Sequence, residues 1–143
     1  MVQSRRPARD DRPPARIGSA SWLTLFVLLG LPVFALIRQS HSVDWRVLFG
    51  VPLVMSIIAF LAYRADKRKA RDGHWRTSES TLHTLEMLGG WPGAFLAQKR
   101  YRHKTAKVSF QLTFWSIVFV HHLVAGDSLS GWKLASRLME WIK

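Results

Sequence analysis

The central part of the chain, residues 62–110, reads AYRADKRKARDGHWRTSESTLHTLEMLGGWPGAFLAQKRYRHKTAKVSF. It leaves one apolar segment, passes through two basic clusters with a Gly-containing, half-apolar stretch between them, and enters another apolar segment. The cations of the two clusters are Arg64, Lys67, Arg68, Lys69, Arg71 and Arg76, then Lys99, Arg100, Arg102, Lys104 and Lys107. Alternation of long apolar and strongly basic stretches is typical of a membrane protein.

The composition agrees with that interpretation. The chain has 143 residues, enough for one domain, and 48% of them are hydrophobic. Its 21 Lys and Arg outnumber 9 Asp and Glu, which gives a net charge of +12. Such a charge requires an anionic partner, either nucleic acid or the phosphate surface of a membrane, and the apolar blocks favour the membrane. Without cysteine, the sequence provides no disulfide, thiolate nucleophile or Cys-based metal site.

Three apolar segments are long enough to cross a hydrocarbon core of roughly 30 Å. They span residues 17–37, 47–63 and 108–125. Pro32 is expected to kink the first span without ending it, as bilayers tolerate. Trp45 and Tyr63 flank the second span, where we interpret them as aromatic anchors at the two membrane interfaces.

The distribution of positive charge predicts the orientation. Residues 1–16 are rich in Pro and Arg and are expected to form a disordered basic tail. The link between the first two spans carries only Arg38 and Arg46. Since positive charge is retained on the cytoplasmic side, the tail and both basic clusters belong inside. The charge distribution thus predicts an inner-membrane protein with a cytoplasmic N-terminus.

Residues 82–96, between the two clusters, could either cross the membrane or return to the side from which they enter. A crossing there would strand one basic cluster outside. Thr77 or Ser78 can cap a helix with Glu79 in its first turn. That helix is expected to stop at Gly89 and Gly90, with GGWPG as a turn up to Gly93 and a second short helix from Ala94. We therefore predict a re-entrant or interfacial helical hairpin over residues 79–101, covered by the second and third spans, with a true crossing as the alternative.

Residues 128–143 place apolar side chains on one helical face and charged ones elsewhere, which predicts an interfacial amphipathic helix. The membrane domain proper then covers residues 17–125. The expected fold class is an all-α integral membrane protein. It has three transmembrane helices, a short re-entrant or interfacial helical hairpin, and a C-terminal amphipathic helix.

A series of motifs in the central stretch carries a family resemblance. They are Asp66-Lys67, Ala70, Trp75-Arg76, Ser78-Glu79, Leu82, Gly89-Gly90, Gly93, the RHKT run from Arg102 to Thr105, Lys107 and Phe110. In order and spacing they resemble a small bacterial membrane family known only as domain of unknown function 1294. The resemblance covers roughly a third of the chain and implies location and architecture. It implies no reaction, because the family has no established activity.

The RHKT run resembles a phosphate-binding patch. Arg102, His103 and Lys104 are consecutive donors, and Thr105 adds a hydroxyl. In the plainer interpretation they contact headgroups non-specifically at the cytoplasmic interface, with about 1 kcal/mol per cation. If the hairpin folds back, the helix start near Ser78 would face the same anion as Arg102.

Two acids are expected to be buried, Asp66 and Glu86. A carboxylate at membrane depth is a functional candidate, and Glu86 is suited to proton or cation transport. The structural alternative is pairing, of Glu86 with His83 or a nearby cation. For Asp66, the expected partners are Lys67, Arg102 or Lys104. The further ion-pair candidates in this region are Lys67, Arg76 and Glu79.

Other site types find little support. His121 and His122 are adjacent and point about 100° apart on a helix, with no further ligand at helical spacing, so no metal site is predicted. No cofactor motif, P-loop or nucleophile triad is present, so we expect a non-enzymatic protein without a cofactor.

The sequence favours binding of an anionic lipid headgroup or of a membrane interaction partner. An oligomeric channel or transporter is one alternative. A membrane-tethered nucleic-acid binder is another, since Trp75 and Tyr101 interleave the basic clusters, but membrane anchoring explains the same composition.

Overall fold

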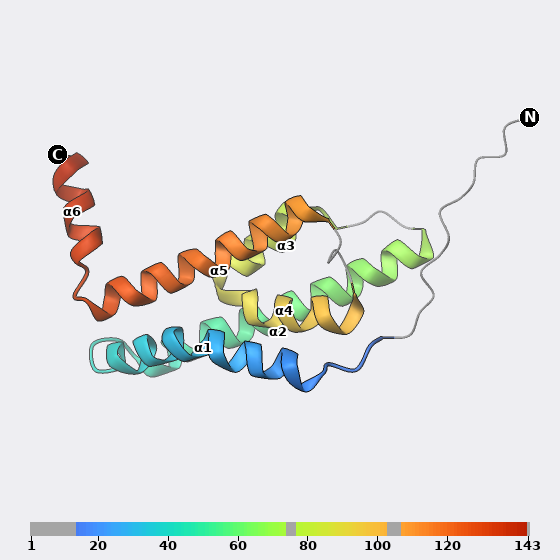
Figure 1. Ribbon diagram of the computed structural model, residues 1–143, viewed down its shortest axis with the longest axis horizontal. Coiled ribbons are helices and arrows are strands. Elements are labelled where there is room, and N and C mark those ends of the chain that lie inside the picture. The colour runs from blue at the N-terminus through green and yellow to red at the C-terminus, as the bar shows by residue number, and fades with distance from the viewer. Residues whose placement is uncertain (1–13, 74–76, 103–106, 143) are drawn as a thin grey trace, which may run out of the picture.

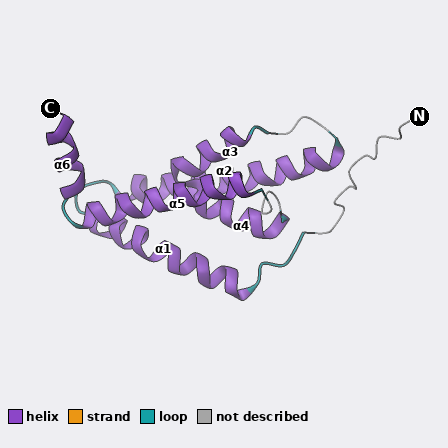
Figure 2. Cartoon of the chain, turned by 45° about the horizontal axis from the view of Figure 1, so that its top comes forward, coloured by secondary structure: helices purple, strands orange, loops and turns teal. Residues whose placement is uncertain are grey.

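The computed structural model describes residues 14–73, 77–102 and 107–142 (Figure 1). The regular elements in these ranges are all helical, which confirms the all-α class (Figure 2). They are α1 (Ser19–Gln39), α2 (Trp45–Asp72), α3 (Glu79–Leu85), the π-turn η1 (Glu86–Gly90), α4 (Trp91–Tyr101), α5 (Val108–Leu129) and α6 (Lys133–Ile142). Most of the predicted basic tail, residues 1–13, lies outside the described ranges.

Three of the described helices, α1, α2 and α5, are long and apolar enough to cross a membrane, as predicted. The helices do not all end where the apolar segments end, because a helix can continue through charged residues. α2 continues through Arg71 to Asp72, well past the predicted end at residue 63. Lys and Arg are good helix formers, so the helix ends only at Gly73, whose φ of 75° provides a left-handed C-cap.

The hairpin formed by α3, η1 and α4 returns to the end of the bundle from which it starts (Figure 1). The ends of α2 and α4 and the starts of α1, α3 and α5 lie together there, while the α1–α2 and α5–α6 connections lie at the opposite end. We call these the basic end and the far end. The basic end comprises residues 14–18, 64–73, 77–80, 99–102 and 107.

The bend of the hairpin is tighter than the sequence suggests. Instead of an open turn over GGWPG, the backbone passes through the π-turn, bends at Gly89 with a φ of 96°, and resumes as α4 at Trp91. The expected start at Ala94 is wrong because Pro92 lies in the first turn of α4, where proline is pre-organised for helix. Ser56 Oγ donates a long hydrogen bond of 3.5 Å to the Gly89 carbonyl.

α4 is the central helix of the bundle. Six of its eleven residues are buried. They are Trp91, Gly93, Ala94, Phe95, Ala97 and Gln98. The core continues into Phe110 and Phe114 of α5 and also includes Leu25 of α1. The first span therefore joins the second and third, which we expected, in covering the hairpin.

α6 begins later than the predicted residue 128, because α5 runs on to Leu129. Left-handed backbone at Gly131 (φ 79°) and Trp132 (φ 60°) then interrupts the helix before α6 begins. The helix projects from the far end, and none of its described residues is buried (Figure 1). The Asp127 carboxylate accepts hydrogen bonds from the backbone N–H groups of Leu134 (2.8 Å) and Ala135 (3.0 Å). This cap ties the start of α6 to the end of α5.

The hairpin packs on α2 through backbone rather than side chains. A Cβ built on Gly93 would lie 1.8 Å from the Ser56 carbonyl oxygen, and one on Gly90 would lie 2.7 Å from that of Met55. Gly89 lies over Pro52, about three helical turns from Tyr63 along α2, so the bend lies roughly 16 Å deeper than that residue. The predicted turn glycines are therefore close-approach positions, and only Gly89 needs its unusual φ.

Gly93→Ala is expected to lower the unfolding temperature of the detergent-solubilised protein, because the new methyl group must push α4 away from α2. Overpacking of this kind costs about 1–3 kcal/mol. Gly30→Ala in α1 is the matched control, since its Cβ would meet no atom within 4 Å. It is expected to be neutral or to stabilise by up to about 1 kcal/mol. Equal unfolding temperatures for the two variants would contradict the close packing.

Candidate functional site

Glu86 lies at the start of the hairpin bend, and its side chain is fully buried. The Tyr63 hydroxyl of α2 donates a short hydrogen bond to Oε1. The His83 Nδ1 atom lies 2.6 Å from Oε2, and the His83 ring packs on Phe110 with 4.2 Å between ring centroids. Both oxygens of Glu86 therefore have donors, as burial of a carboxylate requires.

The hydrogen bonds continue away from Glu86 through two glutamines. Gln98 Nε2 donates to the Tyr63 hydroxyl at 3.2 Å, and Gln111 Nε2 donates to Gln98 Oε1 at 2.8 Å. We call Tyr63, His83, Glu86, Gln98 and Gln111 the buried polar cluster. The two glutamines and Tyr63 each donate toward Glu86, so its Oε1 atom is the final acceptor of a chain of three hydrogen bonds.

Part of this cluster was not expected from the sequence. The interpretation of Tyr63 as an interface anchor is wrong, because the side chain is 0% exposed and bonded within the bundle. Trp45, at the other end of the span, is exposed. Gln98 and Gln111 were also missed. The sequence offered one signal: Gln98 is a polar residue in a short, largely apolar helix near Glu86, whose buried carboxylate needs hydrogen-bond donors.

Two acids hold the loops at the basic end. Asp66 is fully buried, and its Oδ1 accepts a hydrogen bond of 2.7 Å from the backbone N–H of Thr77. This bond ties the end of α2 to the start of α3. Glu79 Oε2 lies 2.7 Å from Lys107 Nζ, which joins the starts of α3 and α5. Both acids thus have structural partners. The pairing of Asp66 with Lys67, Arg102 or Lys104 stays a prediction.

The structure locates only some of the predicted anion-binding residues. Ser78 caps α3 by accepting a hydrogen bond of 3.1 Å from the Thr81 N–H, so its hydroxyl is already engaged. Arg102 ends α4 in a left-handed conformation, with a φ of 47°, and is exposed. His103, Lys104 and Thr105 lie outside the described residues, as does Arg76.

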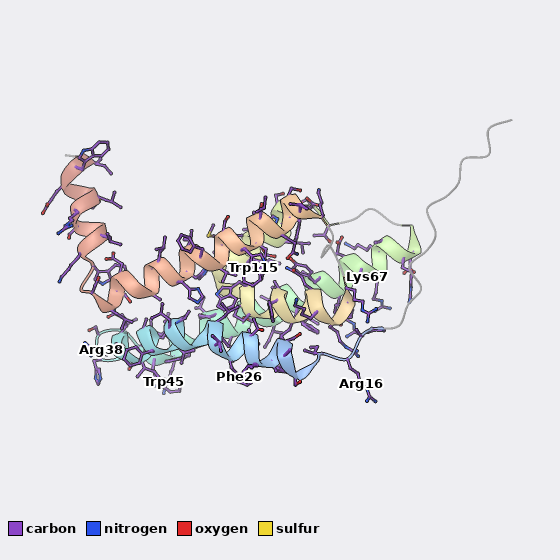
Figure 3. All side chains as sticks on the ribbon, in the orientation of Figure 1. Arg16, Phe26, Arg38, Trp45, Lys67 and Trp115 are labelled. Atoms are coloured by element: carbon purple, nitrogen blue, oxygen red, sulfur yellow. The ribbon has the colours of Figure 1, made fainter. Side chains whose placement is uncertain are left out.

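Cations from several segments share the basic end. The exposed ones are Arg16, Arg64, Arg68, Lys69, Arg71, Lys99, Arg102 and Lys107. Arg100 attaches the N-terminal extension by donating hydrogen bonds to the carbonyls of Pro14 (2.8 Å) and Ala15 (2.6 Å). Figure 3 shows Arg16 and Lys67 toward this end, and Arg38 with Trp45 at the far end.

A second polar contact links α1 to α5. Pro32 has no N–H, so the carbonyl of Leu28, four residues earlier, lacks its helical donor. His122 of α5 supplies one, since its Nε2 lies 2.9 Å from this oxygen. Its Nδ1 lies 2.8 Å from the Val118 carbonyl. Among the hydrogen bonds that the described residues show, this is the one that joins α1 to another membrane-spanning helix.

The histidine pair thus has structural partners, with His121 Nδ1 2.8 Å from the Ile117 carbonyl. In the part of the chain that the structure describes, no three His, Cys, Asp or Glu side chains are grouped to hold a metal ion.

Together these features define a class: a small all-helical membrane protein built around a deep helical hairpin with a buried carboxylate. Residues 56–110 match the family model described as "Protein of unknown function (DUF1294)", which confirms the resemblance. The chain is also 34% identical over 59 residues to "Uncharacterized protein YsdA" of Bacillus subtilis (strain 168). That match spans 41% of this chain and 66% of the relative. No solved structure matches the chain.

The family match begins at Ser56, whose carbonyl meets Gly93, and ends at Phe110, which packs on His83. It therefore contains the hairpin, the contact of Gly93 with Ser56 and the carboxylate of Glu86. α1, α6 and most of α5 fall outside it.

Tyr63→Phe is expected to destabilise the protein by about 1–3 kcal/mol, because it removes the donor to Glu86 and the acceptor for Gln98 inside the bundle. The chain's other tyrosine, Tyr101, packs its ring on Phe60 and is only partly buried. Tyr101→Phe is the matched control, and its effect should be small. Thermal unfolding in detergent measures both, and equal losses would argue against the buried polar cluster.

A double-mutant cycle tests the pairing of Pro32 with His122. His122→Phe is expected to destabilise by about 1–3 kcal/mol, because the Leu28 carbonyl then has no donor. Pro32→Ala restores the N–H that a helix normally aims at that carbonyl. In the Pro32→Ala background His122→Phe should therefore cost less, which gives a coupling energy of at least about 0.5 kcal/mol. Additive effects would show that the two residues are not linked.

Proposed function

We propose that this protein is a non-enzymatic membrane protein whose basic end binds the phosphate of an anionic lipid headgroup. One observation carries the proposal. Exposed cations from the N-terminal extension and from α2, α4 and α5 converge on one end of the bundle, while Asp66 is buried there and Glu79 is paired with Lys107. Positive charge therefore dominates the described surface at this end.

Arg102 is the residue best suited to hold a phosphate. It is exposed at the end of α4, whose other end is fixed by the glycine contacts with α2. A guanidinium can bind phosphate through two parallel hydrogen bonds, which a lysine cannot. Because α4 is held rigidly, it presents Arg102 at a fixed place among the surrounding cations. This favours a defined binding site over diffuse attraction to the charged surface.

The orientation belongs to the same proposal, with the basic end in the cytoplasm of a bacterial cell. Retention of positive charge on that side supports it. Because the chain has no cysteine, single cysteines at Arg71 and at Ser42 can report the two ends. A membrane-impermeant thiol reagent should label Ser42→Cys in intact cells and Arg71→Cys only in inverted vesicles; the reverse pattern would overturn the orientation.

Binding can be measured by titrating the detergent-solubilised protein with dioctanoyl phosphatidylglycerol and dioctanoyl phosphatidylcholine. Saturable binding of the anionic lipid is expected, and Arg102→Ala should weaken it about fivefold or more, the equivalent of about 1 kcal/mol per cation. Arg46→Ala, an exposed cation at the far end, is the matched control and should leave it unchanged. Equal effects of the two variants would contradict a site at the basic end.

Two further titrations separate the alternatives. Inorganic phosphate should compete if the headgroup phosphate is what the site recognises. An oligonucleotide that binds more tightly than the lipid, with a steep loss of affinity as salt rises, would favour nucleic acid instead.

The buried polar cluster supports a second candidate, an oligomeric channel or transporter for protons or cations. Glu86 is a fully buried carboxylate between helices, the kind of group that marks ion pathways in membranes. In proteoliposomes, Glu86→Gln would then abolish a pH-driven flux that the unmodified protein supports. An unchanged flux, or none with either protein, would leave the cluster with a structural role.

A further inference from the structure

A large cavity lies between α1, α2, the hairpin and α5. Its volume is about 920 Å³, within the range of roughly 300–1,000 Å³ typical of ligand sites. Its walls include Pro32 and Val33 of α1, Leu53 and Ile57 of α2, and Trp91 and Leu96 of α4. It extends to the far end, where Gln39, Ser128 and Trp132 line it.

The lining is suited to hydrocarbon and not to water. Three of its polar side chains are already bonded to backbone carbonyls: Ser56 to Gly89, His121 to Ile117, and Ser128 to Ala125. A buried water needs two to four polar partners, which these walls do not offer. Since the cavity lies among the apolar parts of three helices able to span a membrane, its occupant is apolar over most of its length.

The far-end rim differs in character from the walls. Gln39 is the last residue of α1, and Arg38 precedes it; Trp132 of the rim precedes Lys133. Amide, hydroxyl and indole groups therefore line the mouth of an otherwise carbon-lined space, and the cations Arg38 and Lys133 are their neighbours in the sequence. A phospholipid has the same distribution, with a charged phosphate at one end of its acyl chains.

We propose that this cavity binds an acyl chain of a phospholipid from the leaflet at the far end, with the headgroup phosphate near Arg38 and Lys133. The site is independent of the headgroup site proposed at the basic end. The bond of His122 to Leu28 holds α1 in place as one wall, and the glycine contacts of the hairpin with α2 hold the opposite side.

Photo-crosslinking tests the proposal. The full chain is reconstituted in phosphatidylethanolamine and phosphatidylglycerol vesicles that contain a trace of phosphatidylglycerol with a diazirine on its acyl chain. After illumination, labelled residues are identified by mass spectrometry. Label is expected on Trp91, which lines the cavity, and the cavity-filling variants distinguish a chain bound there from lipid around the bundle.

Two matched pairs of variants give the comparison. Val33→Trp and Leu53→Trp fill the cavity, while Val27→Trp and Val54→Trp add the same ring to exposed positions of the same helices outside it. The filling variants are expected to reduce the label on Trp91 at least fivefold relative to their controls. Two pairs on different helices keep the comparison valid if one filling variant fails to fold in gel filtration.

Equal labelling in filling and control variants, or no label on Trp91 in the unmodified protein, would overturn the proposal. A stable dimer in light scattering that Val33→Trp dissociates and Val27→Trp does not would also overturn it, because a second copy would then occupy the cavity. Arg102→Ala should leave the label unchanged, so a failure at the basic end can be told apart from a failure here.

Discussion

The rest of the structure depends on the contact of Gly90 and Gly93 with the carbonyls of Met55 and Ser56. A side chain at either glycine would hold the hairpin away from α2, since even one carbon atom meets backbone there. Close approach lets a short helix pair reach deep into the bundle. In a membrane, a bend at that depth must have its backbone covered by protein, and α2 packs directly against the bend at Gly89 and Gly90. The hairpin is thus the core around which the spans pack.

That core contains the carboxylate of Glu86. Burying this group costs free energy, and its hydrogen bonds select one arrangement of the helices. Moving Glu86 out of water is unfavourable by several kcal/mol unless its partners are placed well. Tyr63, His83, Gln98 and Gln111 come from α2, α3, α4 and α5, so the bonds form only when all four helices are in register. A cluster of this kind favours one arrangement of the helices over other apolar packings.

The two ends of the bundle have different chemistry. The basic end gathers cations on a framework fixed by Asp66 and by the Glu79–Lys107 pair. The far end has a carbon-lined cavity, and α6 projects from it with its start held by Asp127. We propose lipid as the partner at both ends for different reasons, charge at one and shape with apolar lining at the other. The hairpin connects them, since α4 runs from the cavity wall at Trp91 to Arg102.

Sequence alone determined the class and the three spans, and it favoured the return of the hairpin over a crossing, because length, apolarity and charge act locally and additively along the chain. It also determined that Glu86 would be buried and that His83, three residues away on a helix, could pair with it. Only the tertiary structure decided that Tyr63 lies inside, that two glutamines complete its bonds, and that His122 serves the carbonyl freed by Pro32. These contacts join residues 13 to 94 positions apart, and which side chains meet at those separations is set by helix packing.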